Sequence, residues 1–337
     1  MSDSPIGFAP QPRQAMFRQL MTDLRARGTE LRTEATTGRV ADIAEARRGA
    51  VAEVLDLEKR LGDLRTYRDS IALAQSRAET MQASLETLED GTNRLLSEAT
   101  VVLQSDTDES LETLSLAAGD TFRSFVSALN VSLAGRSLFA GDESDGTAVA
   151  GADGLLAAAR TALSGPVTVA DADTALTDLF DDATATQVYL GGTGDAPAVE
   201  VAPGERVAYH LRADSPELRG LLRGVATLAA VFDPATAGAL DATQKRELVE
   251  RAVGNLRNTV ADLNTLRAGL GSAEARIEEA RMRTEAEEGR LTAGYNALTG
   301  RDTLEAAAEM QSVESQLETL FLTTARFSQL SLASFLR

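Results

Sequence analysis

Residues able to carry out chemistry are scarce in this chain. Its 337 residues include one histidine, His210, two lysines, Lys59 and Lys245, and no cysteine. Nucleophilic triads and zinc sites combine histidine or cysteine with further partners, and a P-loop needs lysine behind a run of glycines. None of these spacings occurs. We therefore expect no enzymatic activity, no cofactor site and no metal site, and we expect His210 to be structural or exposed.

One segment begins like a calcium-binding loop. Asp106, Thr107 and Asp108 have suitable oxygen ligands, but Leu111 stands where such a loop needs glycine and Ala117 where it needs glutamate. The segment is better explained as the start of a helix, where Asp and Thr accept hydrogen bonds from free backbone N–H groups.

The charge is strongly acidic and unevenly distributed. The net charge is −18, which argues against nucleic acid and against an anionic membrane surface as partners. Residues 141–200 contain eleven acidic residues and one basic residue, whereas residues 13–60 contain ten basic and eight acidic residues. The middle of the chain is therefore expected to be a solvated module, and the N-terminal flank a surface that meets a partner.

Apolar residues at alternating three- and four-residue spacing predict long helices. After an extended start containing Pro5, Pro10 and Pro12, helices are expected over 13–36, 42–103, 111–129, from 215, over 241–299 and from 302. The seam of the second helix is Ile71, Ala74, Ala78, Met81, Leu85, Leu88, Thr92, Leu95, Ala99 and Val102. That of the fifth includes Leu256, Val260, Leu263, Leu270, Ala273, Ile277, Ala280, Thr284 and Leu291. Such sustained spacing is typical of a coiled coil.

Between these helices the pattern changes. Glycine-rich turns and the short runs "PVTV", "TQVYLGG" and "VEVAPGERVAYHL" predict a few strands between residues 141 and 210, with one short helix at about Ala172–Phe180.

The two long helical segments have nearly equal length. At about 1.5 Å per residue each would span roughly 90 Å. We therefore expect a mainly α protein with a small α+β insert, built as a long antiparallel helical rod whose terminal helices pair at one pole. The predicted divisions are 1–40, an N-terminal assembly helix; 41–140, one half of the rod; 141–214, the acidic insert; 215–300, the other half of the rod; and 301–337, a C-terminal assembly helix.

The terminal helices are amphipathic without a thick core of their own. Segments of this kind often fold only on assembly, and their apolar stripes call for a partner. The expected assembly interface is Leu20, Leu24, Leu31, Leu317, Leu320, Phe327, Leu330 and Phe335.

Three segments resemble the flagellin-like axial proteins of bacteria, and among them the hook–filament junction proteins. "ELRTEATTGRVADIAEA" (Glu30–Ala46) is similar to the family's helix–"tGkri"–helix passage, although "ADIAEA" replaces the usual "psDdP". "GRSLFAG" (Gly135–Gly141) resembles "GkyiFsG" of the junction proteins, and "TTARFSQLSLASFLR" at the C-terminus resembles "a.rl..lSLldyL". Flagellin itself is the alternative, but its usual "ANQ…vLsLLr" ending and "gtkLLdG" motif fit this chain less well. An unrelated adhesion or signalling coiled coil is a third possibility.

The resemblance implies a structural role outside the cell. A junction protein would be exported unfolded through the flagellar type III apparatus without a cleaved signal, after an export chaperone has held its C-terminal helix. It would then form a ring of subunits at the hook tip. Its partners would be copies of itself, another hook-associated protein, and flagellin or hook-side neighbours.

Overall fold

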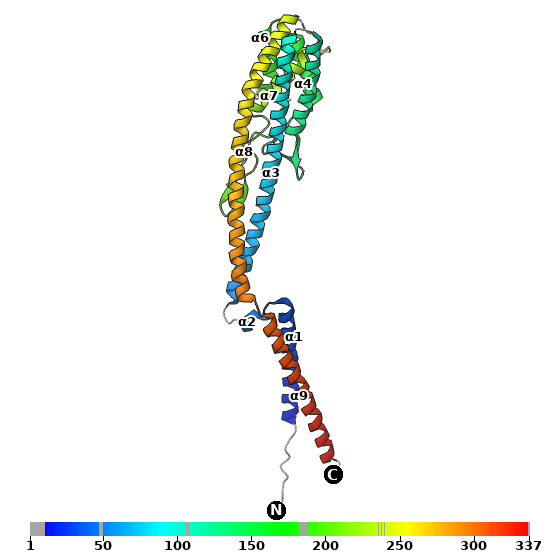
Figure 1. The fold of residues 1–337 in the computed structure, drawn as a ribbon, viewed down its shortest axis with the longest axis vertical. Coiled ribbons are helices and arrows are strands. Elements are labelled where there is room, and N and C mark those ends of the chain that lie inside the picture. Colours follow the sequence, from blue (N-terminus) through cyan, green and yellow to red (C-terminus); the bar gives the residue numbers. More distant parts are fainter. Residues whose placement is uncertain are drawn as a thin grey trace, which may run out of the picture. The chain divides into compact units, whose positions relative to one another are not determined.

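The computed structural model describes residues 11–46, 50–105, 108–181, 188–234, 236, 238 and 240–335. Side chains are not described at 11–14, 45–46, 105, 108, 181 and 327–335. The described chain is mostly helical, with two small two-stranded sheets, as the sequence predicts (Figure 1). It forms two compact units: a terminal unit, Met1–Arg65 with Glu285–Arg337, and a central unit, Thr66–Thr284.

Two long helices are each shared between these units. They are α3 (Val51–Ser105) and α8 (Ala242–Thr299). Neither contains proline, and the predicted seam of each is buried apart from the half-buried Val102 and Val260. The burial confirms the interpretation of the apolar spacing as a helix–helix seam.

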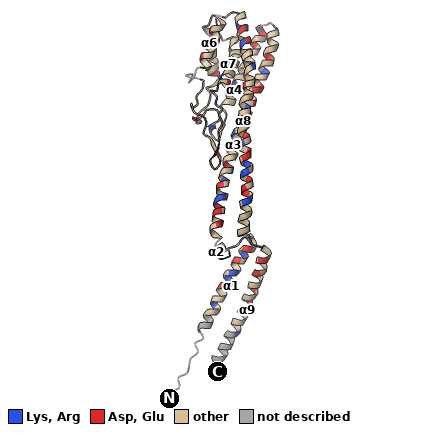
Figure 2. Cartoon of the chain, turned by 90° about the vertical axis from the view of Figure 1, so that its left-hand side faces the viewer, with Lys and Arg blue, Asp and Glu red and all other residues tan. Residues whose placement is uncertain are grey.

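Polar contacts show that α3 and α8 run antiparallel within each unit. In the terminal unit Arg60 forms an ion pair with Glu287 at 2.9 Å, and the Tyr295 hydroxyl donates to Glu58 at 3.0 Å. In the central unit the Gln82 side chain donates to the Arg267 carbonyl at 3.2 Å, and the Arg246 guanidinium donates to the Leu103 carbonyl at 2.8 Å. Charged residues of both signs decorate the two helices along their length (Figure 2), so their outer faces are polar while the seam between them is apolar.

The central unit surrounds these helices with four more. They are α4 (Asp108–Leu129), α5 (Ala152–Ser164), α6 (Val169–Asp181) and α7 (Pro216–Val231). One continuous core contains buried residues of all six helices. Within it the rings of Phe122 and Phe180 meet edge to face, with centroids 6.4 Å apart. On α3, Gly91 leaves room for Phe125: a Cβ there would lie 2.5 Å from Cε1 of the ring.

Two hairpins complete the central unit. The first joins β1 (Ser132–Leu133) to β2 (Arg136–Ser137) through Ala134 and Gly135, both of which have positive φ. That pair of conformations is the tight turn favoured between antiparallel strands. The second joins β3 (Val199–Ala202) to β4 (Glu205–Val207), which confirms the strands predicted from "VEVAPGERVAYHL".

Three helix starts have local caps. Ser215 accepts a hydrogen bond from Leu218 N–H ahead of Pro216. At α8, Asp241 Oδ1 accepts from Gln244 N–H while the Gln244 side chain accepts from Asp241 N–H, both at 2.9 Å. This reciprocal pair is a capping box. The last helix, α9 (Thr303–Phe335), begins after Asp302, whose Oδ1 accepts from Leu304 N–H at 2.8 Å.

The helix content of the insert was underestimated from sequence. Two helices, α5 and α6, stand where one short helix was expected, and the strand predicted at "PVTV" is wrong because Val169 begins α6. Thr168 accepts a hydrogen bond from Asp171 N–H at 3.2 Å, a local cap that outweighs the β-propensity of valine. In "TQVYLGG", Tyr189 makes only an isolated bridge to Val149.

The helix expected over 42–103 is interrupted near its start. A short helix, α2 (Ile43–Ala46), precedes α3, which begins at Val51. Ala50, directly before α3, is not helical. Residues 47–49, the prolines at 5 and 10, and Asp106 and Thr107 of the calcium-like segment lie outside the described residues.

The "GRSLFAG" segment ends in a close backbone approach. Gly141 has φ +67°, and a Cβ there would lie 2.4 Å from the Gly194 carbonyl oxygen. The same carbonyl accepts from Asp142 N–H at 2.9 Å, and Asp142 Oδ1 accepts from Gly194 N–H at 3.0 Å. The final glycine of the motif is therefore required by the contact between two loops of the insert.

A buried tyrosine ties the insert to α3. The Tyr209 hydroxyl donates to the Ala74 carbonyl at 2.6 Å, and burial raises the pKa of Tyr209 to about 12. The ordinary value is about 10. Because the folded state holds this proton more tightly than the unfolded chain does, the stability it contributes is fully present below about pH 10 and is lost as pH rises through about 12.

We therefore expect Tyr209→Phe to make the central unit less sensitive to alkali. Near pH 7 the variant should lose about 1 kcal/mol of unfolding free energy with its hydrogen bond. Between about pH 10 and 12 the parent should lose stability more steeply than the variant. Urea unfolding across this pH range checks both effects, and parallel losses in the two proteins would contradict the assignment.

Candidate assembly surface

The terminal unit presents the surface that the sequence analysis singled out. Its helix α1 (Gln11–Thr37) lies antiparallel beside α9 (Figure 1). Its buried apolar side chains include Leu31, which is 1% exposed, Ala306 and Val313. A Cβ added at Gly28 would lie 3.6 Å from Cγ1 of Val313. This seam is thin, because few large side chains are fully buried in it.

The predicted interface residues divide between the seam and the surface. Leu31 lies inside the pair, whereas Leu24, Leu317 and Leu320 are half-buried and Leu20 is 43% exposed. The side chains of the other three, Phe327, Leu330 and Phe335, lie outside the described residues.

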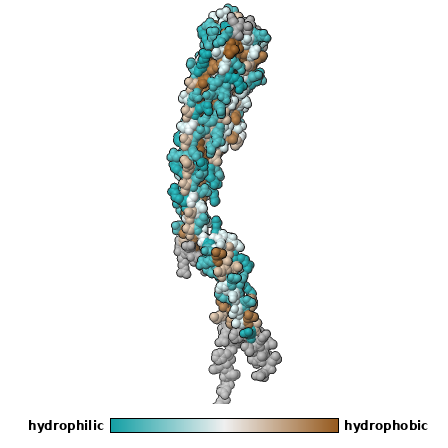
Figure 3. Space-filling model, viewed as in Figure 1, coloured by the Kyte–Doolittle hydropathy of each residue, from teal (hydrophilic) through white to brown (hydrophobic). Residues whose placement is uncertain are grey.

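Further apolar side chains are exposed on the same pair. Met16 is 73% exposed on α1, and Phe321 and Leu322 of α9 are 47% and 61% exposed. Hydrophobic residues also reach the viewed surface of this pair in the space-filling view (Figure 3). These three side chains were not predicted, although Phe321 and Leu322 directly follow the predicted Leu320. Such a concentration of apolar surface on two helices is typical of a surface that binds another protein.

Charged contacts flank the seam of the pair. Arg27 contacts Glu309 at 3.4 Å, Arg32 contacts Glu314 at 3.8 Å, and the Arg25 guanidinium lies 5.4 Å from the Phe321 ring centroid. Solvent screens these exposed pairs, so each contributes at most about 1 kcal/mol.

Among the described side chains of the terminal unit one charged group is buried, and it was not predicted from the sequence. Glu34 is 4% exposed and lies three residues after Leu31, at a seam position. Its Oε1 accepts from Ala41 N–H at 3.1 Å, and its Oε2 lies 3.5 Å from Nε of Arg301. Hydrogen bonding to Glu309, at 2.5 Å, raises the pKa of the Arg301 guanidinium. The sequence could have indicated this buried charge, because Glu34 follows Leu31 by three residues and so occupies a position where the apolar spacing of α1 calls for an apolar residue.

Two turns meet beside this buried charge. Gly38 ends α1 with φ +66°, and Arg39 pairs with Gly300 in an antiparallel bridge. Val40 N–H donates to the Thr299 carbonyl at 2.8 Å, and Arg301 N–H donates to the Gly38 carbonyl at 3.0 Å. The turn after α1 is thus joined by its main chain to the turn between α8 and α9.

His210 has no catalytic setting among the described residues. Its side chain is 75% exposed and pairs with Asp195 through Nδ1 at 2.7 Å. In the described part of the chain, no three His, Cys, Asp or Glu residues are grouped so that they could hold a metal ion. No helix among these residues is long and apolar enough to cross a membrane.

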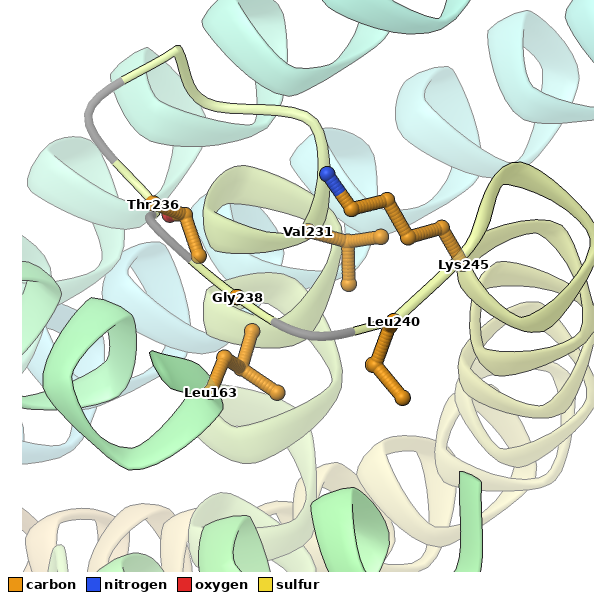
Figure 4. A pocket seen from close by; sticks show the side chains of 6 residues that line it. All are labelled: Leu163, Val231, Thr236, Gly238, Leu240 and Lys245. Atoms are coloured by element: carbon orange, nitrogen blue, oxygen red, sulfur yellow. The ribbon is translucent and has the colours of Figure 1, made fainter. Parts of the chain in front are cut away.

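A pocket in the central unit is too small for a substrate. Its volume is about 10 Å³, room for about one water molecule. Figure 4 shows its lining side chains: Leu163, Val231, Thr236, Gly238, Leu240 and Lys245.

Comparison with known proteins gives one match to a family. Residues 253–336 match the model of the bacterial flagellin C-terminal helical region. No curated protein matches the chain. A solved structure, described as a candidate flagellar hook-associated protein from Vibrio parahaemolyticus, is 14% identical with a TM-score of 0.47, covering 73% of this chain and 99% of its own. At that distance the likeness carries no functional information. Most of α8, from Val253 onward, and all of α9 are therefore similar to the C-terminal helical region of bacterial flagellin.

Proposed function

We propose that this protein is a structural subunit of the bacterial flagellum that joins the hook to the filament. The similarity of residues 253–336 to the flagellin C-terminal helical region carries this proposal. That segment includes Leu317 and Leu320, which belong to the predicted interface.

The terminal unit has the physical character of an assembly element. Its two helices share a thin seam and leave Leu20, Phe321 and Leu322 exposed. About half of each side chain is already covered, so burying the remainder against a neighbouring subunit would contribute roughly 0.7–1.5 kcal/mol for each one. Contacts of this kind between unlike surfaces of identical subunits generate rings or open helical tubes.

Two sequence features favour a junction protein over flagellin. They are "GRSLFAG" at Gly135–Gly141 and the C-terminal "TTARFSQLSLASFLR". Flagellin remains the second candidate, because the matching family model is that of flagellin. In either role the subunit would be secreted, would bind copies of itself and neighbouring axial proteins, and would need an export chaperone for its C-terminal helix.

Deleting the gene in its native bacterium tests the proposal. We expect hooks without filaments and filament protein released into the medium, because the filament lacks its attachment. The intact gene should restore filaments, and a gene carrying Leu317→Asp and Leu320→Asp should not, since a charge would enter the subunit contact. Glu318→Gln with Thr319→Ser, on the exposed face between them, is the matched control and should restore filaments.

The other outcomes distinguish the alternatives. If the chain is flagellin, the deletion should leave hooks with no released filament protein, and the purified chain should elongate filament seeds. Normal filaments in the deletion strain would contradict both flagellar roles and would favour an unrelated coiled coil.

A further inference from the structure

The apolar seam between α1 and α9 does not by itself define which residues face each other. On α1, Leu24 and Leu31 are seven residues apart; on α9, Ala306, Val313 and Leu320 follow the same interval. Sliding one helix by seven residues, about 10.5 Å, would place an apolar side chain opposite Gly28 again. A seam with such a repeat tolerates alternative registers unless a polar group specifies one of them.

Glu34 is the group that breaks this repeat. Its carboxylate is buried at a seam position and is compensated by Ala41 N–H and by the Arg301 guanidinium. After a seven-residue slide, either Arg301 would leave Glu34 or the turns would have to unwind. A buried carboxylate without its partner costs several kcal/mol.

Arg301 is itself held in place on both helices. Its backbone N–H donates to the Gly38 carbonyl at the end of α1. Its guanidinium contacts Glu305 at 3.3 Å and Glu309 at 2.5 Å, on the first two turns of α9. Nε has no hydrogen-bond partner, and its contact with Glu34 at 3.5 Å is electrostatic. The arginine therefore ties the end of α1 to the start of α9.

We propose that Glu34 and Arg301, with the paired turns at Gly38–Val40 and Thr299–Arg301, form a register clasp for the terminal helices. The clasp selects one alignment of α1 against α9, so that the apolar residues outside the seam form a single defined surface. Its contribution is specificity rather than stability, because a buried ion pair is often replaceable by apolar residues without loss of stability. This inference does not rest on the flagellar role.

Crosslinking of introduced cysteine pairs measures the register of α1 against α9 directly, because the chain has no cysteine of its own. Gly28→Cys is combined with Val313→Cys for the observed register, and with Ala306→Cys or Leu320→Cys for slides of seven residues in either direction. The purified full chain is treated with a short bifunctional thiol reagent, and crosslinked yields are compared. With the clasp intact, the observed pair should react at least about tenfold more than either slipped pair, since only that register keeps the buried charge compensated.

Replacing both charged residues tests the clasp. In a Glu34→Leu, Arg301→Leu background we expect the preference to fall below about threefold, while circular dichroism shows the helix content retained. The matched control is Arg32→Leu with Glu314→Leu, which removes an exposed ion pair across the same helices and should keep the tenfold preference. Three results would overturn the proposal. The double variant could keep the parent's crosslinking preference, the control could lose that preference equally, or the parent could show no preference for the observed pair.

Discussion

Phe125→Ala is expected to lower the unfolding free energy of the central unit by about 3–5 kcal/mol. The Phe125 ring is fully buried on α4 and occupies the space that Gly91 of α3 leaves beside it. Truncating it removes the transfer free energy of a buried aromatic side chain and leaves a cavity between two helices, which close packing elsewhere in the core prevents from collapsing fully.

Urea unfolding followed by circular dichroism measures this loss. Phe321→Ala is the matched control, because Phe321 is 47% exposed, whereas Phe125 is fully buried. That variant should change stability by less than about 1 kcal/mol. Equal losses in the two variants would show that Phe125 is not a core residue.

Gly141→Ala should cost about 2–5 kcal/mol, the second largest effect expected. Two penalties combine at this position. A residue with a Cβ pays about 1–2 kcal/mol to adopt the left-handed conformation, and the added methyl group would meet the Gly194 carbonyl oxygen at 2.4 Å. Asp142 N–H donates to that carbonyl, and Asp142 Oδ1 accepts from Gly194 N–H. Relieving the clash would therefore require the two loops to separate, with a further cost of about 1–3 kcal/mol.

A second glycine separates the two penalties. Gly204 has φ +73°, but a Cβ there would meet nothing within 4 Å. Gly204→Ala should therefore pay only the backbone cost of about 1–2 kcal/mol. Thermal and urea unfolding of both variants give the comparison. If Gly141→Ala costs no more than Gly204→Ala, the two loops do not make the close contact described.

Much of the helical framework could be predicted from local sequence. The alternating three- and four-residue spacing of Ile71–Val102 predicted the buried face of α3, because a helix brings such positions to one side. The helices from 215, over 241–299 and from 302 begin close to the predicted residues, because the caps at Ser215, Asp241 and Asp302 act on N–H groups only two or three residues away. The short helix predicted at about Ala172–Phe180 is confirmed as α6, whereas α5 was not predicted and the strand at "PVTV" was wrong, since alanine-rich and valine-containing segments depend on the core for their conformation.

The candidate site was only partly predictable, because tertiary packing decides which apolar residues are buried. Leu31 belongs to the seam and Leu20 reaches the surface, a distinction that needs the position of α9. The five-part division of the chain and the interface stripe remain predictions.

The sequence by itself determined which residues are apolar, how they repeat and where helices start, because these depend on contacts within one or two turns. Only the tertiary structure decided that Glu34 is compensated by Arg301, 267 positions later, and that Tyr209 reaches the Ala74 carbonyl. It also decided that Gly141 must lack a side chain because Gly194 lies against it. Contacts between distant segments follow from the packing of whole helices and loops, and a repeating apolar pattern leaves more than one such packing open.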